Sequence, residues 1–575
     1  MPAVVVLVVV LGAFALGYRF YATYLAEKVY ALDDSRPTPA VEMEDGVDYV
    51  PTNKHVLFGH HFTSVAGAAP IVGPAIAVFW GWVPALLWVS IGTIVAAGVH
   101  DFGALVVSAR NGGRNIGNIA GDIINRRART LFLLILFFLL TLVVAVFAVV
   151  IGNLLVANPG AVIPIFAEIP LAIGIGIYIR RTNTGALVPS IVGVIALYLL
   201  IAVGQAVPIE IDGLAESLGI GARTLWVLIL YAYAFIASRI PVWILLQPRD
   251  YINSHQLFIA LGVIFLGLTI GLDTIEAPAL NSDVPDGSPS FFPFLFVTIA
   301  CGAISGFHSL VSSGTTSKQL AKESDAKYVG YVGALGEGAL ALGSILAVTA
   351  GVAASGIEAD FSTMYPDFAT ASGGAVGNFV NGIAGFASHV GVPIELGTVF
   401  AAVVVISFAA TSMDTGVRLQ RYIVEEIAEL AGARALKRNI TLTTAIAVAV
   451  PLALSLAPGG GEQGYAFGRL WTLFGTTNQL TAGLALAVVA VWVTKGGRSA
   501  VAQIAPLVFL FVMTVWALLE NLGDFISEGD WVLAPLDAII LGLALWLIVE
   551  ATLALRAARA AGGVSEDAEE IGAIT

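Results

Sequence analysis

Residues 58–74 read Phe58-Gly-His-His-Phe-Thr-Ser-Val-Ala-Gly-Ala-Ala-Pro-Ile-Val-Gly-Pro74, a histidine-bearing stretch in an otherwise apolar chain. Its glycines and prolines disfavour one continuous helix. In hydrocarbon, non-helical backbone survives only where protein or a water-filled cavity satisfies its N–H and C=O groups. Secondary transporters build substrate sites from paired broken helices near the membrane centre. This stretch therefore predicts a transport site.

The composition places the chain among membrane proteins. Of its 575 residues, 58% are hydrophobic and 12% are charged, whereas soluble domains carry about 25% charged residues. A single cysteine, Cys301, excludes an internal disulfide framework. No G-x-x-x-x-G-K-[ST] motif is present, which excludes an ATP-hydrolysing motor of that kind. The net charge of −13 indicates no nucleic-acid partner.

Apolar runs of about 20 residues, the length that crosses a bilayer, recur from end to end. The first run, Val4–Leu16, lacks the basic start of a signal peptide and is interpreted as a membrane helix. We expect an all-α polytopic membrane protein with about 15 spans (range 14–18). The segment 371–390 is expected to be re-entrant or interfacial. The expected spans lie near residues 2–25, 56–80, 82–109, 131–157, 163–179, 185–207, 222–246, 255–272, 291–314, 328–354, 394–412, 440–457, 468–493, 501–520 and 531–555.

Charges alternate between successive loops, and this alternation orients the chain. One set of loops is basic: 110–129, 180–181, 318–327, 418–438 and 495–498. The alternate loops are acidic: 210–216, 273–286, 358–367 and 520–530. Because basic loops face the cytoplasm, we expect a multi-pass protein of the cytoplasmic membrane with its N-terminus outside and its C-terminus inside.

A second broken stretch reads Cys301-Gly-Ala-Ile-Ser-Gly-Phe-His-Ser-Leu-Val-Ser-Ser-Gly-Thr-Thr316. Its predicted direction across the membrane is opposite to that of the first. Each stretch is followed by a helix with a lone acid, Asp101 or Glu337. This pattern predicts an inverted repeat with discontinuous helices, although glycine and proline are also simply common in membrane helices. Within one transporter domain (1–575), we expect repeats at about 56–246 and 291–457, additional helices at 468–555 and a polar tail at 556–575.

Several blocks also resemble the carbon starvation protein A family. They are His55-Val-Leu-Phe-Gly-His-His-Phe62, Ala66-Gly-Ala-Ala-Pro-Ile-Val-Gly-Pro74, Val99-His-Asp-Phe102, Gly306-Phe-His-Ser-Leu-Val-Ser-Ser-Gly-Thr-Thr316, Thr411-Ser-Met-Asp-Thr-Gly-Val-Arg-Leu-Gln-Arg421 and Leu470-Trp-Thr-Leu-Phe-Gly-Thr-Thr-Asn-Gln-Leu480. The resemblance implies a secondary transporter related to the leucine-transporter-like superfamily. It implies uptake of peptides or of pyruvate, driven by an ion gradient, with protons as the expected ion and Na⁺ as the alternative. It does not choose between the substrates.

Ionisable side chains inside predicted spans are costly and therefore indicate function. Histidine titrates near neutral pH, so histidine–carboxylate pairs suit proton relay. The candidates for ion coupling are His61, His100, Asp101, His308, Glu337 and Asp414. Water or a helix cap is an alternative role for the His100–Asp101 pair. Asp414 and Arg418, four residues apart, form either an ordinary helix pair or part of an inner gate.

A carboxylate substrate calls for half-helix N-termini, hydroxyls and amides. The competing account is that hydroxyls bond back to their own helix and that amides join helices. Arg239 and Lys318 are expected to be gate or surface charges. The substrate-binding candidates are His60, His61, Gly67, Pro70, Gly73, His308, Ser309, Ser312, Ser313, Asn478 and Gln479.

A metal site would give a function of another class, a membrane metalloenzyme. His60, His61 and His308 are the weak candidate ligands. No H-E-x-x-H spacing is present, and nothing suggests the repeated filter of a channel. We therefore expect a transporter rather than an enzyme, with no cofactor. Its partners are a small-molecule substrate and the lipid bilayer. The sequence does not predict an oligomeric state.

Overall fold

The computed structural model describes residues 1–46, 48–182, 184–357, 360–457 and 467–561. These parts of the chain form helices and connecting segments and contain no β-strand, so the all-α prediction is confirmed. Twelve segments are long and apolar enough to cross a membrane. They are built from α1 (Ala3–Leu16, continuing to Val29), α6 (Trp82–Gly92) with α7 (Gly98–Ala109), α9 (Arg126–Ala157), α10 (Val162–Thr182), α11 (Leu187–Ala206), α14 (Leu246–Gly271), α15 (Phe291–Ile299) with α16 (Gly306–Gly314), α17 (Val332–Leu346) with α18 (Val352–Ala354), α21 (Ile394–Leu430), α24 (Phe467–Lys495), α25 (Val501–Ser527) and α26 (Leu533–Ala560).

Three further segments lie where the other three spans were expected, so that twelve or, with the bent pair, thirteen of the fifteen expected spans are long and apolar enough to cross a membrane among the described residues. α4 (Lys54–Val65) and α5 (Ala69–Ala77) form one span bent by 52°. α13 (Ala222–Ala237) and α23 (Ile440–Leu456) are shorter apolar helices. Short helices lie between these spans: α3 (Pro39–Glu42), α8 (Ile116–Ile123), α12 (Asp212–Ser217), α19 (Phe361–Met364) and α22 (Arg434–Lys437). α2 (Ala22–Tyr24) is part of the first span.

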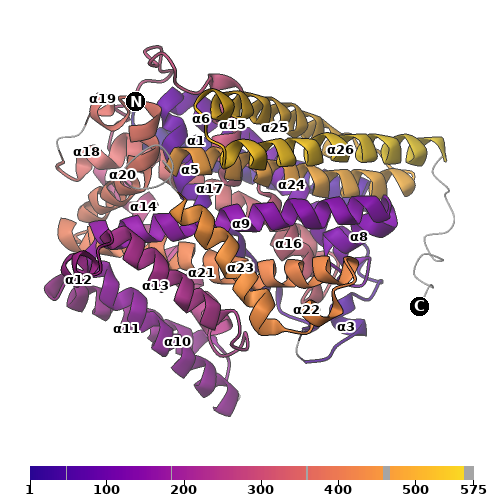
Figure 1. Ribbon diagram of the computed structural model, residues 1–575, viewed down its shortest axis with the longest axis horizontal. Helices are drawn as coiled ribbons and strands as arrows, with labels where there is room; N and C mark the ends of the chain where they lie inside the picture. The colour runs from indigo at the N-terminus through magenta and orange to yellow at the C-terminus, as the bar shows by residue number, and fades with distance from the viewer. Residues whose placement is uncertain (47, 183, 358–359, 458–466, 562–575) are drawn as a thin grey trace.

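The segment expected to be re-entrant or interfacial is a single unbroken helix, α20 (Phe368–His389). At its start, Phe368 packs against Trp80 at the end of the bent span. At its end, His389 Nε2 lies 3.2 Å from Asp273 Oδ1, just after α14. Both ends therefore lie at the same end of the bundle, beside α18 and α19 (Figure 1). This geometry fits an interfacial helix, and the choice between the interfacial and the re-entrant alternative stays a prediction.

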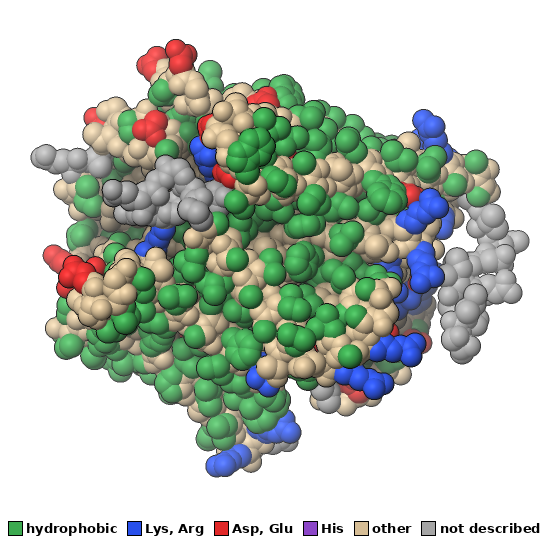
Figure 2. Space-filling model, viewed as in Figure 1, with side chains coloured by type: hydrophobic (Ala, Val, Ile, Leu, Met, Phe, Trp, Pro, Cys, Tyr) green, Lys and Arg blue, Asp and Glu red, His purple; other side chains and the backbone are tan. Residues whose placement is uncertain are grey.

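The two ends of the bundle differ in charge. In Figure 2, most visible Lys and Arg side chains gather at the end where α8 and α22 lie, and Asp and Glu prevail at the opposite end. The first residues belong to the acidic end, because the Ala3 N–H donates to Asp273 O at 2.9 Å. The predicted segregation of charged loops is therefore present in the fold.

Burial separates an inner group of helices from an outer one. The side chains of α9, α21 and α24 are mostly buried. In contrast, α1, α11 and α26 expose large apolar side chains such as Val8, Leu199 and Trp546. An exposed apolar girdle of this kind suits contact with lipid rather than water.

The two broken segments pack directly against one another. A Cβ at Gly73 of α5 would lie 2.4 Å from the Thr298 carbonyl oxygen of α15. A Cβ at Gly302, between α15 and α16, would lie 2.8 Å from Pro74 Cγ. Glycine is thus needed at Gly73 because the α15 backbone approaches too closely for any side chain, and at Gly302 because the Pro74 ring and the Ala341 methyl group occupy the space. The two breaks thus contact one another, whereas the inverted repeat and the repeat boundaries stay predictions.

Candidate functional site

Four buried ionisable side chains form a chain of hydrogen bonds, which we call the acid–histidine cluster: His100, Asp101, His308 and Glu337. His100 Nδ1 lies 2.7 Å from Asp101 Oδ1. His308 Nδ1 lies 2.8 Å from Asp101 Oδ2. His308 Nε2 lies 3.2 Å from Glu337 Oε1. His308 therefore bridges two carboxylates, and a proton placed on it would be held by both.

Three helices bring these groups together. α7 carries His100 and Asp101, α16 carries His308, and α17 carries Glu337. His100 and Asp101 are both fully buried, so the alternative in which surface water satisfies this pair is wrong. The His100 Nε2 atom has no hydrogen-bond partner among the described residues. The cluster thus brings two carboxylates and two imidazoles together in the protein interior.

The adjacent histidines of the opening stretch do not join this chain of hydrogen bonds. His61 Nδ1 lies 2.9 Å from Thr316 Oγ1, and its buried Nε2 finds no partner in the described part of the protein. A Cβ at Gly333 would lie 2.6 Å from the His61 ring, so His61 packs against α17 near the cluster. His60 is half-buried. His61 is therefore the member of the pair that is held inside the protein.

The hydroxyls predicted to bind substrate mostly bond within their own segment. Ser309 Oγ donates to Gly306 O at 2.7 Å, and Ser313 Oγ donates to Ser309 O at 2.5 Å. Ser313 Oγ also accepts the Ile116 N–H at 2.9 Å. Ser312 Oγ is buried and has no partner among the described residues. Of the three predicted serines, Ser312 is thus the one whose hydroxyl remains available.

Asn478 of α24 occupies the N-terminus of α16. Its Oδ1 accepts the Phe307 N–H at 3.2 Å, and its Nδ2 lies 2.9 Å from Cys301 Sγ. Gln479 Nε2 donates to Phe296 O at 2.7 Å. Both amides therefore join α24 to the second broken segment, as the helix-joining alternative predicts.

The break in the first segment lies against α21. Gly67, Pro70 and Gly73 are all buried. A Cβ at Gly67 would lie 2.5 Å from Ser412 Oγ, which places the unwound backbone beside this hydroxyl. α5 then begins at Ala69. Its N-terminus carries the partial positive charge that attracts anions.

A second buried ionic group was missed by sequence reasoning. Arg249 of α14 contacts Asp414 Oδ2 through Nη1 at 2.6 Å. Its Nε lies 3.5 Å from Glu168 Oε1 of α10. The Asp414–Arg418 pairing expected from the i,i+4 spacing is wrong, because Arg418 Nη2 donates instead to the Ala237 and Ile240 carbonyls. Glu168 is the lone acid of the apolar run 163–179, and this isolation was the signal that could have revealed it.

Neither ionic group is arranged as a metal site in the described part of the chain. Within the described ranges, no group of three or more His, Cys, Asp or Glu side chains is arranged to hold a metal ion. His60, His61 and His308 in particular do not converge, since His61 bonds to Thr316 and His308 to Asp101 and Glu337.

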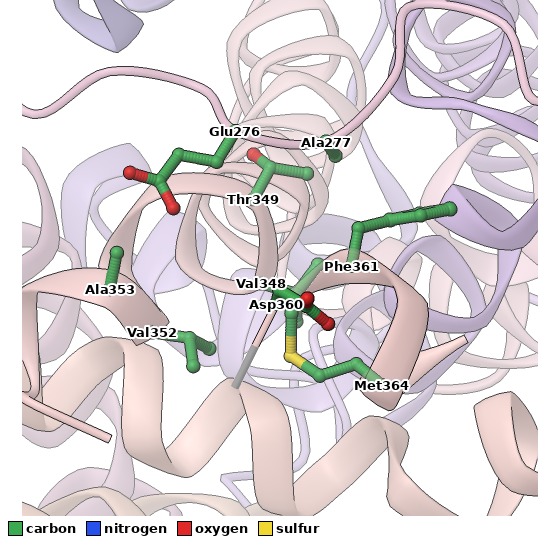
Figure 3. A pocket seen from close by; sticks show the side chains of 9 residues that line it. All are labelled: Glu276, Ala277, Val348, Thr349, Val352, Ala353, Asp360, Phe361 and Met364. Atoms are coloured by element: carbon green, nitrogen blue, oxygen red, sulfur yellow. The ribbon is translucent and has the colours of Figure 1, made fainter. Parts of the chain in front are cut away.

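A small recess is lined by residues 276–277, which follow α14, by residues 348–353 and by residues 360–364 at α19 (Figure 3). Its wall includes Glu276, Thr349 and Met364. Asp360 also lines it, but its carboxylate accepts the Thr363 N–H at 2.8 Å and thereby caps α19. This capping bond holds the pKa of Asp360 below its usual range. The recess therefore offers a surface depression rather than a built site.

The comparisons with known proteins cover nearly the whole chain. The family model described as carbon starvation protein CstA matches residues 2–364 and 349–517. The chain belongs to this family. The resemblance seen in the sequence blocks is thereby confirmed.

Relatives agree with this membership. The peptide transporter CstA of Campylobacter jejuni is 33% identical over 92% of this chain and 81% of its own. The peptide transporter CstA of Bacillus subtilis is 33% identical over 90% of each chain. The pyruvate/proton symporter BtsT of Escherichia coli is 38% identical over 61% of this chain and 49% of its own. This family member is thus a multi-pass membrane transporter and not an enzyme.

Solved structures show only a coarse likeness. The protein MhsT in complex with L-phenylalanine matches with a TM-score of 0.49 and 14% identity, over 87% of this chain and 99% of its own. The Eremococcus coleocola manganese transporter matches with a TM-score of 0.43 and 15% identity, over 89% of this chain and 99% of its own. These TM-scores and identities are too low for either solved structure to indicate the helix arrangement of this protein.

Proposed function

We propose that this transporter imports small carboxylates, peptides or pyruvate, together with protons across the cytoplasmic membrane, with its C-terminus inside. The relatives named as peptide transporters and as a pyruvate/proton symporter support the substrate class and the ion. The basic end of the bundle, where α8 and α22 lie, supports the orientation.

The acid–histidine cluster is the observation that carries the proposal. His308 lies between Asp101 and Glu337. A buried charge is costly unless it is paired. Gain or loss of one proton therefore changes the charge balance of three helices at once. Such a cluster is suited to bind a proton on one side of the membrane and to release it on the other after the helices move.

The substrate carboxylate is assigned to the α4–α5 break. The N-terminus of α16 is already capped by Asn478, whereas α5 begins beside Ser412 without a side-chain cap. Backbone N–H groups and the helix dipole can hold a carboxylate at such an end, worth up to ~2 kcal/mol in a partly buried geometry. His61 and the free hydroxyl of Ser312 are the proposed polar contacts for the rest of the substrate.

The test is uptake into proteoliposomes of labelled pyruvate and of a di- and tripeptide panel, under imposed H⁺ or Na⁺ gradients. We expect accumulation under a pH gradient, and accumulation driven by Na⁺ alone would contradict proton coupling. Amidated peptides and neutral pyruvate analogues should compete poorly with the acids. Equal competition by uncharged analogues would show that the carboxylate is not recognised.

Substitution of His308 tests the role of the cluster. His308→Gln should abolish pH-driven accumulation while exchange of substrate across the membrane persists, because translocation can continue without the coupling ion. His55→Gln is the matched control, since His55 is exposed at the protein surface. Normal accumulation by His308→Gln would remove the cluster from the mechanism.

A further inference from the structure

Two helices face each other with matching rows of polar side chains, which we call the polar seam. α14 contributes Arg249, Asn253 and Gln256, and α21 contributes Ser407, Thr411 and Asp414. Each set is spaced i, i+4 and i+7, which places its members on one helix face. Arg249 pairs with Asp414 at 2.6 Å, and Asn253 Nδ2 donates to Thr411 Oγ1 at 2.7 Å. Glu168 of α10 extends the seam, because its Oε2 accepts the Ser407 hydroxyl at 3.0 Å.

The seam is short of hydrogen-bond donors. Outside the Arg249–Glu168 ion pair, three acceptors of the seam have no hydrogen-bond partner among the described residues: Asp414 Oδ1, Asn253 Oδ1 and Gln256 Oε1. Only one donor outside that ion pair, Gln256 Nε2, also lacks a partner there. Buried polar groups normally find partners, so this concentration of orphaned acceptors points to something that the seam binds.

The charges of the seam are also unbalanced. Arg249 is its one cation, and it faces the carboxylates of Glu168 and Asp414. Asp250, the next residue of α14, adds a third acid with an unpartnered buried Oδ1 atom. A metal cation would lie against the guanidinium and be repelled by it. A proton avoids this conflict, because it neutralises one carboxylate and turns an acceptor into a donor.

We propose that the polar seam binds a second coupling proton, shared by the Glu168 and Asp414 carboxylates around Arg249. This inference rests on the proposed proton-coupled function and adds a site separate from the acid–histidine cluster. Binding forms one O–H bond on a carboxylate, and release to the cytoplasmic side restores the anion. The titratable and charged groups facing the two acids are Arg249, Asp250 and Tyr233, whose OH donates to Asp414 Oδ2 at 2.7 Å. Arg418, one turn further along α21, is held by backbone carbonyls.

Protonation of the seam has a mechanical consequence. The Arg249–Asp414 pair joins α14 to α21, so neutralising Asp414 weakens this connection. α21 also carries Ser412, which lies beside Gly67 in the α4–α5 break. α14 packs against α4 as well, through Phe258 and Phe62 with ring centroids 5.7 Å apart. A change in the seam is thus transmitted to the proposed carboxylate site from two sides.

The number of protons transported with each substrate molecule, the coupling ratio, tests whether the proton of the seam takes part in transport. In proteoliposomes, the pH gradient that just balances a known substrate gradient yields the number of protons per substrate. We expect a ratio of two for the wild type, and a ratio lower by one for Glu168→Gln and for Asp414→Asn. Glu395→Gln, an exposed acid at the start of α21, is the matched control. An unchanged ratio in both seam variants would overturn the proposal.

Infrared spectroscopy tests proton binding without any transport. In pH-jump difference spectra of the reconstituted full chain, the wild type should show a protonated-carboxyl band that disappears in Glu168→Gln or Asp414→Asn and persists in Glu395→Gln. A band that both seam variants retain would overturn the proposal even if the wild type transports. A band that is present in the wild type and lost in the seam variants, while the wild type shows no pH-driven uptake, would support proton binding by the seam and refute the proposed function. Two independent variants keep the test decisive if one of them fails to fold.

Discussion

Gly73→Ala probes the contact that holds the two broken segments together. The added Cβ would lie 2.4 Å from the Thr298 carbonyl oxygen, 3.0 Å from the Ile299 carbonyl oxygen and 3.1 Å from Ile299 Cα. All three atoms belong to the backbone, so no side-chain rotation can relieve the overlap. Ordinary contact at 3.4 Å would require α5 and α15 to separate by about 1 Å, judged against close-packed interiors.

The expected loss follows from two opposing effects. Overpacking lowers the free energy of unfolding by about 1–3 kcal/mol. Replacement of a helical glycine by alanine raises it by about 0.5–1 kcal/mol. We therefore expect Gly73→Ala to lower the free energy of unfolding by up to about 2.5 kcal/mol on these magnitudes. Gly262→Ala in α14 is the matched control, because nothing lies within 4 Å of its added Cβ, and it should be neutral or slightly stabilising.

Denaturant titration of the purified full chain in mixed lipid–detergent micelles measures the free energy of unfolding of both variants. Uptake by the same two variants then shows whether the forced separation of the breaks also impairs transport. If Gly73→Ala is as stable as Gly262→Ala, the close packing of the two broken segments is not present in the native protein.

Two further predictions concern helix caps. Asn478→Ala should destabilise the protein by about 1–3 kcal/mol because it leaves the buried Phe307 N–H without an acceptor; denaturant titration checks this, and Asn478→Asp, which keeps an acceptor, should lose less. Asp367 caps α20 by accepting the Thr370 N–H at 2.8 Å, and this bond lowers the pKa of the Asp367 carboxyl. A lowered folded-state pKa means that the stabilisation is present above the unfolded value of about 3.9 and is lost as the pH falls through the folded value. Asp367→Ala should therefore speed amide hydrogen exchange in α20 at neutral pH, by an amount matching about 0.5–2 kcal/mol, with the difference from wild type vanishing in strong acid; equal exchange at neutral pH would show that the cap is dispensable.

The sequence alone determined those features that depend on local chemistry. The length of the apolar runs predicted the spans, because about 20 residues are needed to cross a bilayer. The glycines and prolines of residues 58–74 and 301–316 predicted the breaks, because these residues weaken helices wherever they stand. The alternation of charged loops predicted the two ends of the bundle. Asp101, His308 and Glu337 were recognised singly, since an ionisable group in an apolar run is conspicuous without any knowledge of its neighbours.

Only the tertiary structure decided which of these groups meet. Asp101 and His308 are 207 residues apart, and Arg249 and Asp414 are 165 apart. From the sequence, Arg418 was one of the alternatives for Asp414, as a helix pair, because the i,i+4 rule considers a single helix. Arg249 was placed in a loop between two predicted spans and so escaped notice, although it lies in α14. Pairing across helices follows from how side-chain ridges and glycine contacts bring helices together, and this depends on the whole bundle rather than on any one segment.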